Sequence, residues 1–217
     1  TMEEFELAKD KVLMGVERRS MVMPEEERRN TAYHESGHAL VAHFMPGGLP
    51  IGKMSIIARG QAGGFTRWQQ EDKSYASQEQ LEAQIAAAMG GRAAEVLKMG
   101  DVTTGATDDF EQATNVAREM VMRLGMSEKL SHRSFGKRQG GTVFLGRELS
   151  EERDYSLKTE SIIDDEINRL LREGEERANT ILVDRDKELE GIARFLLEHE
   201  TIDLDQFLAI IENRDPL

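Results

Sequence analysis

The stretch HESGH, residues 34–38, constrains this 217-residue chain more than any other feature of its sequence. It fits the pattern His-Glu-x-x-His. Residues four apart on a helix lie one above the other, so the imidazoles of His34 and His38 could reach one metal ion. Glu35 would lie on the flank of that face, where it can take a proton from a water that the metal activates. The pattern therefore predicts a helix that carries two ligands and the general base of a zinc hydrolase site.

Two neighbours of the motif refine this prediction. Gly37 lies inside the expected helix, where glycine costs about 1 kcal/mol relative to alanine, so we expect another segment to approach closely there. His43 follows His38 by five residues, which places it about 140° further around the helix. His43 therefore cannot share the metal, and we interpret it as a surface or packing residue.

Composition limits the chemistry and the partners. The chain has no cysteine, which excludes disulfides, Cys-ligated zinc and thiol nucleophiles. Its formal net charge of -13 argues against a nucleic-acid surface. No apolar run approaches the roughly 18 residues of a membrane span, so we expect no direct membrane insertion by this piece. Residues 150–217 carry 20 acidic and 9 basic residues, so the acidic surplus belongs to the C-terminal part.

The spacing of apolar residues predicts a mainly α fold with a small β insert. We expect helices over residues 2–20, 24–45, 77–99 and 108–124, and a series of helices from residue 150 almost to the end. Two short β-like runs, residues 53–58 and 64–69, follow the motif, and a hairpin is expected within residues 137–147. We divide the chain into a core over residues 1–149 and an acidic helical region over residues 150–217 of the same domain. The start inside a helical pattern indicates a piece of a longer protein.

A zinc site needs a third ligand, and the residues leave two candidates. A metzincin would place Gly and His where this chain has Val41 and Phe44, so that class is excluded. Glu95 lies on a following helix, as the third ligand of a gluzincin does. Asp109 lies in the first turn of the helix after that, behind a glycine-containing loop. An aspartate at a helix start is also an ordinary partner of the helix dipole. Spacing alone therefore leaves Glu95 and Asp109 open.

Six segments of the chain resemble, in order, the peptidase domain of the FtsH-type ATP-dependent zinc metalloproteases. They are AKDKVLMGVERRSMVM (8–23), TAYHESGHALVA (31–42), MGGRAAEV (89–96), TTGATDDFEQAT (103–114), AREMVMRLGMSEKL (117–130) and VFLGR (143–147). The resemblance covers about residues 3–211 and is far more specific than the bare motif. It implies a helical HExxH domain with one Zn²⁺ per chain, bound by His34, His38 and Asp109. It also implies Glu35 as the catalytic base, and it leaves Glu95 either as a residue that supports a ligand or as a salt-bridge partner on the helix surface.

The β insert resembles the substrate-binding edge strand of this family. We expect such a strand near residues 53–69, with Ile56, Ile57, Ala58, Arg59 and Gly60 in contact with substrate. The family usually has Pro-Arg-Gly at the step where this chain has Ala, Arg and Gly. An edge strand can accept an extended polypeptide as one more strand, which makes few demands on its sequence.

The resemblance implies the endopeptidase domain of a membrane-anchored, ATP-driven homo-hexamer that degrades unfolded, misfolded, tagged or membrane proteins. This soluble piece has no phosphate-binding loop, so ATP and Mg²⁺ would bind in the absent ATPase portion. We expect the parent protein in the bacterial inner membrane with this domain in the cytoplasm, or in an organelle membrane. Two alternatives stay open: a catalytically silent copy that serves as an assembly platform or chaperone ring, and a monomeric peptidase that acts alone on small peptides.

Overall fold

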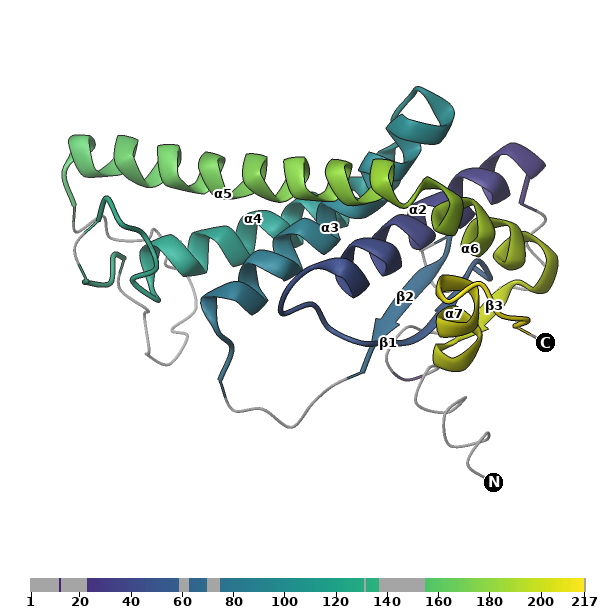
Figure 1. The fold of residues 1–217 in the computed structure, drawn as a ribbon. Coiled ribbons are helices and arrows are strands. Elements are labelled where there is room, and N and C mark those ends of the chain that lie inside the picture. Colours follow the sequence, from purple (N-terminus) through teal and green to yellow (C-terminus); the bar gives the residue numbers. More distant parts are fainter. Residues whose placement is uncertain are drawn as a thin grey trace.

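The computed structural model describes residues 12, 23–58, 63–69, 75–130, 132–136 and 155–216. Its helices are α2 (Glu25–Phe44), α3 (Gln78–Met99), α4 (Thr107–Met122), α5 (Leu157–Asp184), α6 (Asp186–His199) and α7 (Leu204–Ile211), with a 3₁₀ turn, η1 (Thr104–Ala106). Its strands are β1 (Ile51–Ser55), β2 (Phe65–Trp68) and β3 (Thr201–Asp203). The prediction of a mainly α fold with a small β insert is confirmed (Figure 1).

Local sequence explains where the central helices begin and end. The first turn of α2 follows Pro24 and holds three glutamates at the positive end of the helix dipole. The side chain of Ser77 accepts a hydrogen bond from the backbone N–H of Gln80, which closes a capping box at the start of α3. Gly100 ends α3 in the left-handed conformation, with φ of 72°. The expected helix over residues 2–20 and the hairpin within 137–147 lie outside the described residues, apart from Val12, which is helical.

The sheet is antiparallel, and its strand order is β2-β1-β3. Met54 of β1 pairs with Thr66 of β2 on one side and with Ile202 of β3 on the other. Both sides of Lys53–Ser55 are therefore occupied. Within the described sheet, the edge strand of the insert is β2. The strand β3 differs from the expected series of helices from residue 150 almost to the end.

The packing of α2 against α3 depends on two facing glycines. A Cβ on Gly37 would collide with the carbonyl oxygen of Gly90, and a Cβ on Gly90 would lie 2.6 Å from the carbonyl oxygen of Gly37. The close approach predicted at Gly37 is therefore confirmed. Around this pair, α5 runs along α3 and α4, while α6 packs on α2 (Figure 1).

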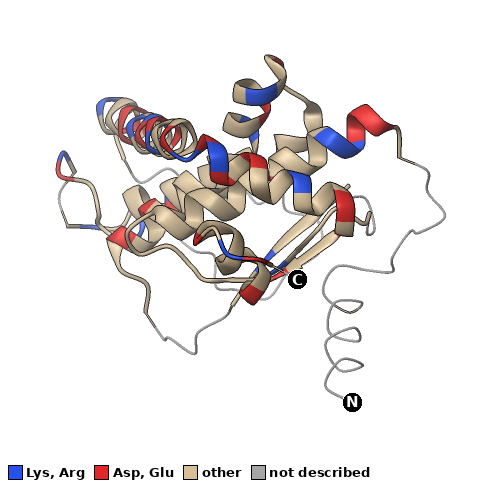
Figure 2. Cartoon of the chain, turned by 45° about the vertical axis from the view of Figure 1, so that its right-hand side comes forward, with Lys and Arg blue, Asp and Glu red and all other residues tan. Residues whose placement is uncertain are grey.

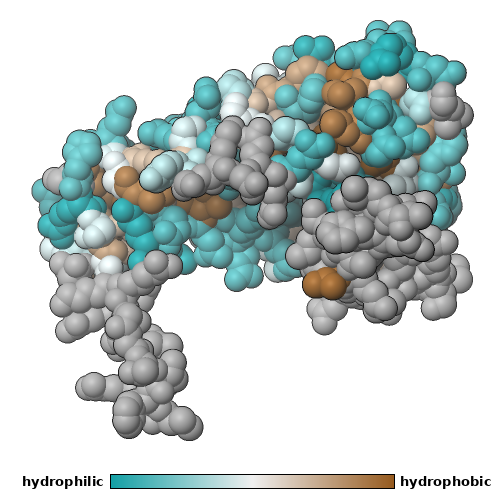
Figure 3. All heavy atoms as spheres, turned by 90° about the horizontal axis from the view of Figure 1, so that it is seen from below, coloured by the Kyte–Doolittle hydropathy of each residue, from teal (hydrophilic) through white to brown (hydrophobic). Residues whose placement is uncertain are grey.

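The surface is predominantly polar. The long helix α5 carries acidic and basic residues along its length, and Figure 2 shows both signs of charge distributed over the described chain. On the face seen in Figure 3, hydrophilic residues cover most of the described surface, with apolar areas between them. None of the helices in the described part of the chain is both long enough and apolar enough to span a bilayer.

Candidate metal centre

Three side chains from two helices converge at one point beside α2. His34 and His38 project from α2, and Asp109 comes from the first turn of α4. The Nε2 atoms of the two histidines lie 2.9 Å apart. Oδ2 of Asp109 lies 3.2 Å from Nε2 of His34 and 3.3 Å from Nε2 of His38. Among the described residues these three form the group that could hold a metal ion.

The hydrogen bonds on the far side of each ring define which nitrogen carries the proton. Nδ1 of His38 lies 2.8 Å from the carbonyl oxygen of Ala87, which can only accept, so this Nδ1 donates. Nδ1 of His34 lies 2.8 Å from Oε1 of Glu95 and donates in the same way. In the neutral rings, both Nε2 atoms are then acceptors that face each other and a carboxylate oxygen. Three acceptors meet without a donor between them.

This donor set fits zinc. Imidazole nitrogen and carboxylate oxygen are ordinary zinc ligands, and bonds of about 2.0–2.1 Å in a tetrahedral arrangement put neighbouring ligand atoms about 3.3 Å apart. The separations of 2.9, 3.2 and 3.3 Å are close to that spacing. The protons held on Nδ1 by Glu95 and Ala87 keep both Nε2 atoms available for the metal.

The electrostatics also favour a positive charge at this point. Burial lowers the pKa of His34, but hydrogen bonds to Asp109 and Glu95 and the charge of Glu35 raise it to about 10. Burial raises the pKa of Asp109, but the hydrogen bonds and charges of the two histidines hold it well below its usual range. The surrounding carboxylates therefore stabilise either a proton or a metal cation between these side chains.

Glu95 connects one histidine to the loop that delivers Asp109. Its side chain is only 1% exposed. Oε2 accepts a hydrogen bond from the backbone N–H of Thr103 at 2.8 Å, and Oε1 accepts from the Thr103 hydroxyl at 3.1 Å. Thr103 is the N-cap of η1, which leads directly into α4. Glu95 thus lies on the Nδ1 side of His34, where it orients the ring and fixes the loop.

Glu35 lies next to the group but outside it. The residue is 6% exposed, and the Thr66 hydroxyl donates a hydrogen bond to its Oε2 at 2.7 Å. Burial raises the pKa of Glu35, although the two histidines and the Thr66 hydrogen bond act in the opposite direction. His43 is exposed on the same helix, and its ring contacts the rings of Phe44 and Phe207. The interpretation of His43 as a surface or packing residue agrees with this position.

A third glycine brings α3 against the imidazoles. A Cβ on Gly91 would lie 2.6 Å from Nε2 of His38 and 2.7 Å from Nε2 of His34. Sequence reasoning missed this contact, although the pair of glycines within a predicted helix was a signal for it. It also missed the contacts of Thr66 and Thr103, for which the sequence offers no comparable signal because they join segments far apart in the chain.

The group opens into a cleft of about 400 Å³ between α2, α3, β2 and the start of α4. Gly64, Phe65, Thr66 and Trp68 line its strand side, while Ala42, Leu49, Ala83 and Ala87 supply apolar lining. Three of the five substrate residues expected from the sequence lie in the described part of the chain. Ile56, Ile57 and Ala58 follow the end of β1 and do not line the cleft. Arg59 and Gly60 lie outside the described residues.

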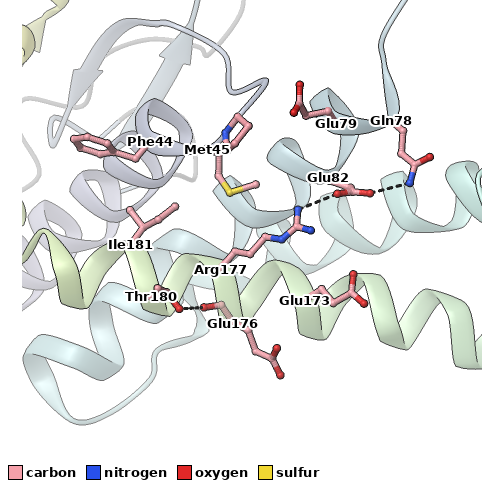
Figure 4. Close-up of a pocket in the computed structure, with 11 residues that line it drawn as sticks. Phe44, Met45, Gln78, Glu79, Glu82, Glu173, Glu176, Arg177, Thr180 and Ile181 are labelled. Atoms are coloured by element: carbon pink, nitrogen blue, oxygen red, sulfur yellow. Dashed lines mark hydrogen bonds and ion pairs between the residues drawn. The ribbon is translucent and has the colours of Figure 1, made fainter.

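A larger groove of about 820 Å³ lies elsewhere, between the end of α2, the start of α3 and the middle of α5 (Figure 4). Phe44 and Met45 are among the residues that line it. Arg177 crosses it and pairs with Glu82 at 2.9 Å. The residues that line this groove include no histidine, and none of them belongs to the metal-binding group. The metal-binding group lines the smaller cleft instead.

Two histidines on one helix, a carboxylate from a later helix and a buried glutamate beside them form the arrangement of an HExxH metallopeptidase. A scan of protein families matches residues 21–210 to peptidase family M41. The chain is 46% identical to the ATP-dependent zinc metalloprotease FtsH 1 of Conexibacter woesei, over 99% of this chain and 33% of that protein. It is 46% identical to FtsH of Veillonella parvula, over 94% of this chain and 32% of that protein.

The same relationship holds for FtsH of Acidobacterium capsulatum, at 45% identity over 99% of this chain and 34% of that protein. The chain belongs to peptidase family M41 and is a metalloendopeptidase domain. The resemblance inferred from the six segments is confirmed. The chain spans about a third of the length of the curated relatives it matches.

Proposed function

We propose that this chain hydrolyses peptide bonds with a zinc ion held by His34, His38 and Asp109. The observation that carries the proposal is the convergence of two imidazole Nε2 atoms and one carboxylate oxygen, which lie 2.9, 3.2 and 3.3 Å from one another. When bound, zinc supplies Lewis-acid chemistry, since it acidifies water and polarises a peptide carbonyl. Glu35 takes the proton of the attacking water and returns it to the amine that leaves. Glu95 supports His34 and the loop before Asp109 without binding the metal.

Substrate lies along β2 in this proposal. This strand ends the described sheet on the side of the cleft, and its residues line the cleft beside Glu35. An extended peptide that adds to a sheet edge is held through its main chain. The apolar lining formed by Ala42, Leu49 and Ala83 accommodates an apolar side chain of that peptide. This mode of binding suits the degradation of many unfolded proteins.

The relatives are named ATP-dependent zinc metalloproteases, and they are about three times as long as this chain. We propose that the parent protein is a membrane-anchored homo-hexamer that degrades unfolded, misfolded or tagged proteins. ATP and Mg²⁺ act in a separate portion of it. The location that fits this proposal is the bacterial inner membrane, or an organelle membrane, with this domain on the cytoplasmic, matrix or stromal side.

Glu35→Gln tests the mechanism. We expect it to lower the hydrolysis of an unstructured peptide by the zinc-loaded chain by roughly 10²- to 10⁴-fold, because the proton-transfer group is lost. Zinc content measured by elemental analysis should stay near that of the original chain. Glu26→Gln, on an exposed position of the same helix, is the matched control and should leave both quantities unchanged.

Equal hydrolysis by Glu35→Gln and the original chain would remove Glu35 from the mechanism. A zinc-loaded original chain that hydrolyses neither peptide nor casein would favour the silent assembly platform instead. Light scattering and the ATP dependence of hydrolysis by the complete protein separate the hexamer from a monomeric peptidase that acts alone.

A further inference from the structure

The carboxylate of Glu35 is held by the strand that borders the cleft. Because Glu35 is buried, the partners of its carboxylate determine where it points. The Thr66 hydroxyl donates to Oε2 at 2.7 Å, and this is the hydrogen bond to the Glu35 side chain within the described residues. The contact joins residues 31 positions apart, one on α2 and one on β2.

The other oxygen of the same carboxylate packs against the beginning of this segment. A Cβ on Gly64 would lie 2.9 Å from Oε1 of Glu35 and 2.8 Å from the carbonyl oxygen of Ser55. The backbone at Gly64 therefore passes so close to the carboxylate that any side chain would displace it. One oxygen accepts a hydrogen bond from Thr66, and the other lies close to the backbone of Gly64 two residues earlier.

The sheet fixes the position of the Thr66 hydroxyl. Thr66 pairs with Met54 of β1, which is itself held between β2 and β3. A β-branched side chain is stiff at χ1, so the hydroxyl has little freedom once the backbone is placed. The glutamate side chain is long and flexible by comparison, and it loses several rotamers when it is held at one point.

We propose that Thr66 is a positioning residue, which acts through Glu35 and sets the base relative to the strand along which substrate lies. This inference rests on the proposed role of Glu35 as general base. The hydroxyl of Thr66 fixes the carboxylate, while the backbone of the same strand aligns the peptide. The base and the scissile bond are thereby placed by one structural element.

The test compares Thr66→Val with Thr66→Ser in the full zinc-loaded chain, using an unstructured fluorogenic peptide. Valine keeps the shape of threonine but lacks the hydroxyl, so we expect kcat to fall about 10- to 100-fold, as for the loss of a hydrogen bond to a charged group. KM should stay within about twofold. Serine keeps the hydroxyl and should restore most of kcat. A loss of kcat in Thr66→Ser as large as in Thr66→Val would overturn the proposal.

A second measurement separates positioning from binding. Trp68 is the single tryptophan of the chain, and it lines the cleft, so its fluorescence reports peptide binding. In a Glu35→Gln background, where turnover is removed, adding Thr66→Val should leave the Kd for the peptide and the zinc content unchanged. A raised Kd, with kcat intact in the single variant, would mean that Thr66 binds substrate and does not position the base.

The outcomes also distinguish this inference from the proposed function. Hydrolysis by the original chain that Glu35→Gln abolishes and Thr66→Val leaves intact would overturn the role of Thr66 alone. Hydrolysis that survives Glu35→Gln would overturn the base itself, and the positioning role with it.

Discussion

Two buried glutamates show how differently this chain uses a charge in its interior. Glu95 and Glu166 are each 1% exposed. Glu166, on α5, accepts a hydrogen bond from the hydroxyl of Ser127 at 2.8 Å and pairs with Lys129 at 3.0 Å and Arg169 at 3.2 Å. Each of these partners is a donor that this chain supplies itself. The charge of Glu166 is matched entirely within the protein.

In the part of the chain that the structure describes, the metal-binding group next to Glu95 lacks lysine and arginine partners of this kind. The two imidazoles next to it use their N–H donors on Glu95 and Ala87, and their remaining nitrogens face Asp109 as acceptors. Three carboxylates, from Glu35, Glu95 and Asp109, surround the two rings, and they favour a proton or a metal cation between these side chains. A buried charge with its own donors links neighbouring helices, whereas a cluster of buried acceptors favours binding of a proton or a metal cation.

The largest effect is expected on zinc affinity, when a residue of the metal-binding group is changed. Asp109→Asn removes the anionic member of the group, and we expect zinc affinity, measured by competition with a chelator, to fall well over 100-fold. Glu95→Gln removes only the support of a ligand and should lower affinity by about 10- to 100-fold. Asp108→Asn changes the neighbouring exposed aspartate and should have little effect. A larger loss in Glu95→Gln than in Asp109→Asn would identify Glu95 as the ligand.

A somewhat smaller effect is expected when Glu166 is changed, and it should appear in the stability of the fold instead of in zinc binding. Glu166→Gln leaves Arg169 and Lys129 without their shared carboxylate. Their side chains are 32% and 60% exposed, so water compensates part of the loss, and we expect a decrease of roughly 2–3 kcal/mol in the free energy of unfolding. Urea denaturation measures this change. Asp165→Asn, exposed on the same helix, should change stability by less than about 0.5 kcal/mol.

The sequence predicted one of these clusters well and the other not at all. The spacing of His34, Glu35 and His38 follows from helix geometry, and the family resemblance supplied Asp109. Glu166 looks in the sequence like any acid on a charged helix, because its partners Ser127 and Lys129 lie about 40 residues earlier in the chain. A contact between distant segments leaves no local pattern.

The sheet shows the same limit. The two β-like runs were predicted from alternation and composition, and their antiparallel pairing agrees with a short connection. The third strand has three residues and only Ile202 is buried, which is too little for a pattern to indicate. Because β3 pairs with β1, β1 is the inner strand of the sheet, and β2 is the edge strand beside the cleft. The pairing that makes β1 an inner strand therefore comes from a partner almost 150 residues away.

The smallest expected effect is the loss of stability at acidic pH that comes from Glu166. Burial raises the pKa of Glu166, but its hydrogen bonds to Arg169, Lys129 and Ser127 lower it from 4.5 to about 2. A carboxyl group with a depressed pKa contributes stability that is present above its unfolded value and is lost as the pH falls towards the folded value. We expect the original chain to lose roughly 1–2 kcal/mol more than Glu166→Gln between pH 4.5 and 3, measured by urea denaturation without added metal. Parallel losses in the two proteins would show that Glu166 is already protonated, or already solvated, in the folded state.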